Sequence, residues 1–173
     1  ELLKMDLSME EGDWKPTPHG QCLAEVLAEN NIVRGKTVLE LGAGTANHTI
    51  LFARQGAAHI VATEISEPFA ETTRVNVERN APGAPVECRV ADWLSTEGEY
   101  DVVVTNPPFC MSGKQNRRYY IDSLILDAHK RLKPGGVLAF VQSSMADLKK
   151  TLRRLDENGY DAEILGERTG PFR

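Results

Sequence analysis

Short apolar runs alternate with longer amphipathic stretches along this chain. The runs are four to six residues long, and most of the stretches between them could hold a helix. We expect strands at 37–41, 59–63, 86–90, 101–105, 137–142 and 162–165. We expect helices at 46–55, 68–80 and 119–132, and a last helix that begins at 144. Strands that alternate with helices predict an α/β protein with a doubly wound, mostly parallel, Rossmann-like sheet.

The two C-terminal helices carry clear end signals. Lys133-Pro-Gly-Gly136 cannot continue a helix and is predicted to stop the one over 119–132. Ser144 is predicted to cap the last helix, with Asp147 three residues on as an imperfect capping box. Gly159 is the residue type expected just after a helix end. The predicted apolar stripe of the last helix is Met145, Leu148, Leu152 and Leu155.

Length and composition are those of one globular domain. The chain has 173 residues, of which 41% are hydrophobic and 26% are charged. Residues 1–15 are a polar lead-in, interpreted as a linker, an arm over a site or the stump of an absent domain, and 16–173 are expected to form the folded domain. No apolar run approaches the roughly 18–20 residues that span a bilayer, so no membrane partner is expected.

Cysteine usage argues against disulfide and metal chemistry. Cys22, Cys88 and Cys110 are odd in number and include no CxxC pair, so neither a disulfide framework nor a metal site is predicted. Thiols of this kind suit a reducing compartment, and no signal peptide is visible after Glu1. We therefore expect a cytoplasmic protein.

The net charge of −5 hides an asymmetry between two parts of the chain. Residues 1–105 carry 8 Lys and Arg against 17 Asp and Glu, whereas residues 106–173 carry 12 against 8. The basic excess begins near Lys114, Arg117 and Arg118. These side chains are interpreted either as a surface that steers an anionic partner or as solvated helix faces.

A glycine turn follows the first predicted strand. Gly42 and Gly44 lie between the strand over 37–41 and the next helix, where glycine lets the backbone approach a ligand closely. Ligands of doubly wound sheets bind outside the carboxyl ends of the strands. The third glycine of a dinucleotide fingerprint is replaced by Asn47, so a dinucleotide is not expected here.

Acidic residues end three of the predicted strands. Glu40 precedes the glycine turn, where it would repel a pyrophosphate but suit a cation or an amine. Glu64 ends the second strand, 20 residues after Gly44, at the position of an acid that accepts ribose hydroxyls. Asp92 and Trp93 follow the third strand and could receive an exocyclic amine and a purine face. The predicted ligand is an adenosine with free ribose hydroxyls and a cationic tail.

The strand over 101–105 ends in Asn106-Pro-Pro-Phe109. Two consecutive prolines cannot donate to a sheet ladder and disfavour helix at the residue before them, so the chain must leave the sheet in a stiff, extended turn. That turn presents an amide, backbone carbonyls and an aromatic ring at a strand end. Such a cluster can hold a flat, hydrogen-bonding group against a cofactor.

These motifs resemble those of class I S-adenosylmethionine (SAM)-dependent methyltransferases, over about residues 15–165. Asn106-Pro-Pro-Phe109 resembles the motif of the amino-methylating branch, and the chain is most similar to release-factor glutamine methyltransferases and small-domain RNA methyltransferases. Lys15-Pro-Thr-Pro18 resembles the segment that covers the cofactor in them. The resemblance implies a cofactor site of Glu40, Gly42, Gly44, Thr45, Glu64, Ile65, Asp92, Trp93 and Asn106. It implies catalytic roles for Asn106, Pro107 and Phe109.

The resemblance implies direct in-line transfer from the sulfonium of SAM to a planar amino nitrogen. The Asn106 side-chain oxygen and the Pro107 carbonyl would accept the two N–H bonds, and Phe109 would stack on the planar group. No strong base is required, so His48 is expected to be a packing or solvent residue. Position 109 is Phe where Tyr is commoner in the family. The chain stops at Pro171-Phe-Arg173, where the family's last strand would start, so that strand is an open point of the prediction.

A protein glutamine amide is the first expected acceptor, an RNA base amine the second and a small-molecule amine the third. An acceptor with anionic groups would lie near Lys114, Arg117 and Arg118. A nicotinamide-dependent oxidoreductase is opposed by Asn47 at the third glycine position. A third alternative is a catalytically silent subunit that stabilises a partner. The presence of Asn106 and of the acidic residues at the strand ends argues against it, because a silent relative need keep neither. The oligomeric state stays open.

Overall fold

The computed structural model of the chain describes residues 1–13, 15–108 and 118–170. Within them, five parallel strands form one sheet in the order β3-β2-β1-β4-β5. The strands are β1 Thr37–Leu41, β2 His59–Glu64, β3 Val86–Val90, β4 Tyr100–Thr105 and β5 Leu132–Phe140. The helices are α1 Pro18–Glu29, α2 Asn47–Arg54, α3 Glu67–Asn80, α4 Tyr119–Asp127 and α5 Leu148–Glu157, with 3-10 turns η2 Ala128–Arg131 and η3 Ser144–Ala146. This is the predicted doubly wound α/β fold.

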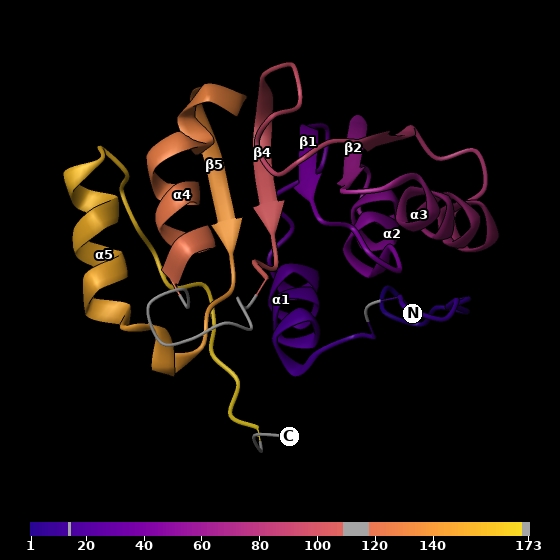
Figure 1. Ribbon diagram of the computed structural model, residues 1–173, viewed down its shortest axis with the longest axis horizontal. Coiled ribbons are helices and arrows are strands. Elements are labelled where there is room, and N and C mark those ends of the chain that lie inside the picture. Colours follow the sequence, from indigo (N-terminus) through magenta and orange to yellow (C-terminus); the bar gives the residue numbers. More distant parts are fainter. Residues whose placement is uncertain (14, 109–117, 171–173) are drawn as a thin grey trace.

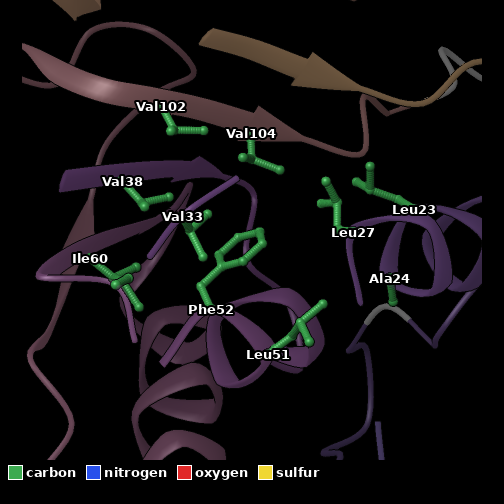
Figure 2. Packing of buried hydrophobic residues seen from close by; sticks show 11 residues of the cluster. Leu23, Ala24, Leu27, Val33, Val38, Leu51, Phe52, Ile60, Val102 and Val104 are labelled. Atoms are coloured by element: carbon green, nitrogen blue, oxygen red, sulfur yellow. The ribbon is translucent and has the colours of Figure 1, made fainter. Parts of the chain in front are cut away.

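Alternate residues of the central strands face two separate hydrophobic clusters. Val38 of β1 and Val104 of β4 lie in one cluster, together with Phe52 of α2 and residues of α1. Figure 2 shows the Phe52 ring pointing from α2 toward these strands. Leu39 of β1 lies in the second cluster, with residues of α4 and η2. Helices therefore cover both faces of the sheet (Figure 1), as the continuous apolar strands require.

The strand β5 starts earlier than its sequence predicts. We expected Lys133-Pro-Gly-Gly136 to separate the helix from a strand at 137–142, but β5 runs over Leu132–Phe140, and the helix before it ends at Asp127 and continues as η2. Tyr100 pairs with Leu132 and Val102 with Val137, so the Pro-Gly-Gly stretch is a bulge inside the strand. A Cβ on Gly136 would lie 2.9 Å from the Lys133 carbonyl oxygen, so glycine is required there.

The last helix begins with a different cap from the one predicted. Ser144 lies inside η3, and the Asp147 side chain accepts a hydrogen bond from the Lys150 amide at the start of α5. Met145 is 56% exposed and is therefore not part of the buried stripe, whereas Leu155 is buried. Gly159 follows the end of α5 at φ +83°, as its position predicts.

Residues 162–165 do not form the strand that their composition predicts. No pairing is made there, and Ile164 and Leu165 are exposed. The segment instead crosses to α1, where Arg168 contacts Glu25 at 3.0 Å and Glu29 at 2.6 Å. A strand forms only where a neighbouring strand offers free backbone N–H and C=O groups. The side chains of α1, which this part of the chain contacts, offer no such groups. The prediction of a strand here was therefore wrong.

The lead-in over residues 1–13 lies along α3. The Asn76 side chain accepts from the Ser8 amide at 2.7 Å and donates to the Ser8 carbonyl at 2.8 Å. Asn80, one helical turn on, makes the same pair of bonds with Asp6, at 2.8 and 2.7 Å. The two side chains therefore hold the extended backbone as a neighbouring strand would. The lead-in reaches the carboxyl edge of the sheet near Asp13, whose carboxylate accepts a hydrogen bond from the Thr72 hydroxyl.

Within the described residues, no helix combines the length and the apolar character that a bilayer span requires.

Candidate active site

The carboxyl ends of β1, β2 and β4 meet at one edge of the sheet. Leu41 pairs with Thr63 on one side and with Thr105 on the other. The Thr105 hydroxyl donates to the Leu41 carbonyl at 2.9 Å and fixes the end of β4 against β1. The glycine turn, Glu64 and Asn106 each follow these paired positions, so the topology brings together three features that lie far apart in the sequence.

The glycine turn is an open cradle. Gly42 and Gly44 have φ angles of +70° and +56°, which residues with a Cβ rarely adopt. The amides of Gly42 and Ala43 both donate to the Thr63 carbonyl at 3.0 Å, and the Thr73 hydroxyl donates to the Gly44 carbonyl at 2.7 Å. No atom lies within 4 Å of a Cβ built on either glycine, so the turn leaves room for a ligand.

The Glu64 carboxylate is buried beside this turn. One oxygen accepts from the Gly44 amide at 2.5 Å and the other from the Ile65 amide at 3.3 Å. Burial raises the pKa of Glu64, the two backbone hydrogen bonds lower it, and the charges of Glu40 and Asp13 raise it, with a net rise. Among the described residues Glu64 has no cationic partner, so a ligand that brings two hydroxyl donors would satisfy it.

Glu40 is almost fully buried and is paired inside the protein. One carboxylate oxygen lies 3.1 Å from His48 Nδ1, and the other accepts from the Thr49 hydroxyl at 2.5 Å. The other ring nitrogen, Nε2, lies 2.9 Å from the Gly20 carbonyl. The Gly20 carbonyl can only accept, so Nε2 donates to it, and a protonated ring would also donate from Nδ1 to the Glu40 carboxylate. Burial lowers the pKa of His48, but the hydrogen bond and charge of Glu40 outweigh it and raise the pKa.

We expect this ion pair to make stability depend on pH. Because the pKa of His48 is raised in the folded state, its contribution is complete below about 6.5, the ordinary value, and is lost as pH rises through the folded-state pKa. His48→Gln should lower the free energy of unfolding in mild acid and remove the decline that begins above about 6.5. Urea unfolding between about pH 5 and pH 9 measures both effects.

The exposed His129 supplies the matched control for that measurement. His129→Gln should keep the decline of the parent protein. Parallel curves for the parent protein and His48→Gln would contradict a raised pKa of His48 in the folded state.

Asn106 lies against the first turn of α1. Its side-chain Nδ2 donates to the Thr17 hydroxyl oxygen at 3.3 Å, and the same oxygen accepts from the Gly20 amide at 3.1 Å as the N-cap of α1. Pro107 is buried and Pro108 is exposed. Phe109 lies outside the described residues. The structure thus places Asn106 beside the segment 15–18, which sequence reasoning associated with the cofactor.

The remaining predicted cofactor residues differ in their surroundings. Thr45 is buried in the glycine turn, whereas Ile65 is 57% exposed and Asp92 is exposed. Trp93 adopts φ +50°, donates from Nε1 to the Ser123 hydroxyl at 3.1 Å and packs edge-on against another ring of α4. Its ring is therefore held by α4, and a role toward an adenine stays a prediction.

The predicted anionic-partner surface is described only at Arg118. That guanidinium bonds Asp122 at 2.9 Å, the carbonyl of Ala146 and the Thr151 hydroxyl, and its side chain is 12% exposed. Arg118 therefore ties α4 to α5. Lys114 and Arg117 lie outside the described residues, so the surface stays a prediction.

Sequence reasoning gave Gly20 no role at this edge, and it did not foresee the contacts of Thr17 and His48. Thr17, Gly20 and His48 come from α1 and α2, yet they join Asn106 to Glu40 through successive contacts. Thr17-Pro18 carried a usable signal, because a threonine followed by proline is a strong helix start. For His48 no local pattern distinguishes a ring that faces a buried carboxylate from one that packs.

Residues 18–163 match the methyltransferase small domain family, so the chain belongs to that family. It is a SAM-dependent methyltransferase.

The relatives differ in what their names say they methylate. The chain is 29% identical over 156 residues to a proposed protein N5-glutamine methyltransferase of Methanocaldococcus jannaschii, covering 81% of this chain and 78% of that one. It is 29% identical to a 16S rRNA N2 methyltransferase of T. thermophilus solved with AdoMet (SAM) and guanosine, with a TM-score of 0.65 over 86% of this chain and 40% of that one. A ribosomal protein L11 methylase of Lactobacillus delbrueckii has the same fold, at a TM-score of 0.72, 22% identity, and coverage of 89% and 76%.

Proposed function

We propose that the chain transfers the methyl group of SAM to a planar amino nitrogen, and that this nitrogen is the side-chain amide of a protein glutamine. The observation that carries the proposal is the position of Asn106, whose Nδ2 is bound to Thr17 at the carboxyl edge of the sheet. An amide held in this way has its oxygen available as an acceptor for an incoming N–H. The relative named for glutamine methylation, which this chain covers to 78%, supports the same acceptor.

The cofactor half of the proposed site is built on the glycine turn. Gly42 and Gly44 leave the backbone open to the ligand, and Thr45 lies buried behind it. Glu64 would accept the two ribose hydroxyls in addition to the two backbone amides that it already binds. Asp92 and Trp93 would bound the adenine, with Ile65 beside it. Glu40 would act on the cationic tail together with His48 rather than as a bare carboxylate, because both its oxygens have partners.

The acceptor half is assigned to the turn after β4. Bound SAM supplies an electrophilic methyl group, so the protein has mainly to align the nitrogen and exclude water. The Asn106 oxygen and the Pro107 carbonyl would accept the two N–H groups of the acceptor. Two such acceptors concentrate lone-pair density toward the methyl and stabilise the positive charge that develops on the nitrogen. Phe109 would hold the planar group by stacking.

An RNA base amine is the second candidate acceptor. Two observations favour it: the 29%-identical neighbour that was solved with guanosine, and the basic excess over residues 106–173. An exocyclic base amine is planar and has two N–H groups like a glutamine amide, so the same pair of acceptors would serve both. The two substrates differ in the rest of the molecule, since RNA binding weakens steeply with added salt.

Transfer from tritiated SAM to a cell extract separates the candidates. Label that protease removes and ribonuclease does not is the result expected for glutamine. Label that ribonuclease removes would replace the glutamine assignment with a base, and label that survives both treatments would point to a small molecule. The Asn106→Ala protein, added at the same concentration, gives the background.

A further inference from the structure

The hydroxyl of Thr17 contacts two groups that lie far apart in the sequence. Its oxygen accepts from the Gly20 amide at 3.1 Å, which caps α1, and from Asn106 Nδ2 at 3.3 Å, which lies 89 residues away in the sequence. The first bond belongs to the helix alone. The second has no role in capping, and it reaches the residue on which the proposed chemistry depends.

The direction of the Asn106 amide decides what it can do. An asparagine side chain has a donating nitrogen and an accepting oxygen at equivalent positions, and rotation by half a turn exchanges them. Only the oxygen can accept an N–H of a substrate, whereas the nitrogen would meet that N–H donor to donor. In the structure the Thr17 oxygen accepts from Nδ2, and this bond holds the amide with its nitrogen on Thr17 and its oxygen turned away from it.

The start of α1 is built to hold Thr17 at this place. Pro18 begins the helix with a fixed φ, and Gly20 lets the first turn lie close to Asn106. A Cβ on Gly20 would lie 3.2 Å from Asn106 Nδ2 and 3.4 Å from the Thr17 hydroxyl oxygen. The Gly20 carbonyl in turn accepts from His48 Nε2 at 2.9 Å. The start of α1 is thus held by two contacts, one with Asn106 after β4 and one with His48 of α2.

We propose that Thr17 is a positioning residue for methyl transfer, which keeps the Asn106 oxygen turned toward the acceptor nitrogen. The proposal rests on the function proposed above. It differs from a role in helix capping alone, because it ties the loss of rate to the orientation of one amide. Thr17 acts through Asn106, so its removal should lower kcat while the affinity for SAM stays unchanged.

The test combines Thr17→Val with Asn106→Asp. Thr17→Val removes the acceptor at nearly constant shape and should lower kcat about tenfold, as one lost hydrogen bond predicts. In the Asn106→Asp background both side-chain oxygens accept, so no orientation has to be selected, and the same change should cost less than about twofold. An equal factor in both backgrounds would overturn the proposal, because a capping defect would act equally on each.

A second set of variants serves if the Asn106→Asp protein is too slow to measure. Thr17→Ser keeps the hydroxyl and should retain the parent kcat within about twofold. Thr17→Gly keeps most of the capping energy but has no acceptor, so it should be as slow as Thr17→Val. The proposal is overturned if kcat among these variants correlates with their melting temperature and not with the presence of a hydroxyl group at position 17.

Any acceptor that the parent protein labels is sufficient for these assays. Absence of transfer by the parent protein would count against the proposed function. Transfer by the parent protein at a rate that Thr17→Val leaves unchanged would count against the role of Thr17 alone.

Discussion

Replacing Asn106 with alanine is expected to lower kcat for methyl transfer by about 10²–10³-fold, the usual cost of one group that stabilises transition-state charge. The side chain is the acceptor that the proposed mechanism places on the substrate nitrogen, and alanine supplies none. SAM affinity should change by less than about threefold, because the cofactor contacts assigned to Glu64 and the glycine turn are untouched. Single-turnover transfer and calorimetric titration with SAM measure the two quantities separately.

Asn158→Ala is a matched control for that variant. Its amide also belongs to an asparagine, but it donates to the Arg154 carbonyl at the end of α5, away from the site. The control should keep the parent rate. Full activity of Asn106→Ala would contradict the proposed mechanism. A loss of SAM affinity as large as the loss of rate would mean that Asn106 binds the cofactor and not the acceptor.

Replacing Glu64 with alanine is expected to weaken SAM binding by roughly a hundredfold. Two hydrogen bonds from ribose hydroxyls to a carboxylate are worth about 3 kcal/mol together, and tenfold in Kd corresponds to about 1.4 kcal/mol. The variant should also lose the bonds that Glu64 makes to the amides of Gly44 and Ile65 in the free protein. Unchanged SAM affinity would contradict the ribose assignment.

The raised pKa of Glu64 adds a dependence on pH. Its ordinary value is 4.5, and burial raises the pKa in the folded protein, so ionisation costs stability as pH rises from 4.5 through the folded-state pKa. Ribose donors favour the ionised form, so SAM affinity should increase over the same interval. Glu64→Gln should flatten both curves, whereas Glu99→Gln, at an exposed position, should leave them as they are. A pH-independent Kd in the parent protein would show that Glu64 does not titrate against the ligand.

The positions of four of the five strands were predictable because they depend on local pattern. The strands over 37–41 and 86–90 have the predicted bounds, and β2 and β4 each extend their predictions by one residue. Parallel pairing then places every strand end at one edge, which is why Glu40, Glu64 and Asn106 could be grouped before any contact was known.

The contacts that organise the site were not predictable in the same way. The strand predicted at 162–165 was wrong because pairing depends on what lies alongside a segment, and here the chain runs to α1, where Arg168 contacts Glu25 and Glu29. The bond between Thr17 and Asn106 joins residues 89 apart in the sequence, and no periodicity encodes it. The contacts of His48 with Glu40 and Gly20 likewise join residues that only the fold brings together.

The chemical state of the transferred methyl group tests the central proposal most directly. A methylated side-chain amide releases methylamine on acid hydrolysis, because the bond between the carbonyl carbon and the methylated nitrogen is cleaved. Protein labelled with tritiated SAM is therefore hydrolysed in acid, the hydrolysate is made alkaline, and the volatile amine is collected. Labelled methylamine from the parent reaction, and none with Asn106→Ala, is the predicted result. Label that stays on a nucleobase, or on carbon, oxygen or sulfur, would contradict the proposed transfer to a glutamine amide.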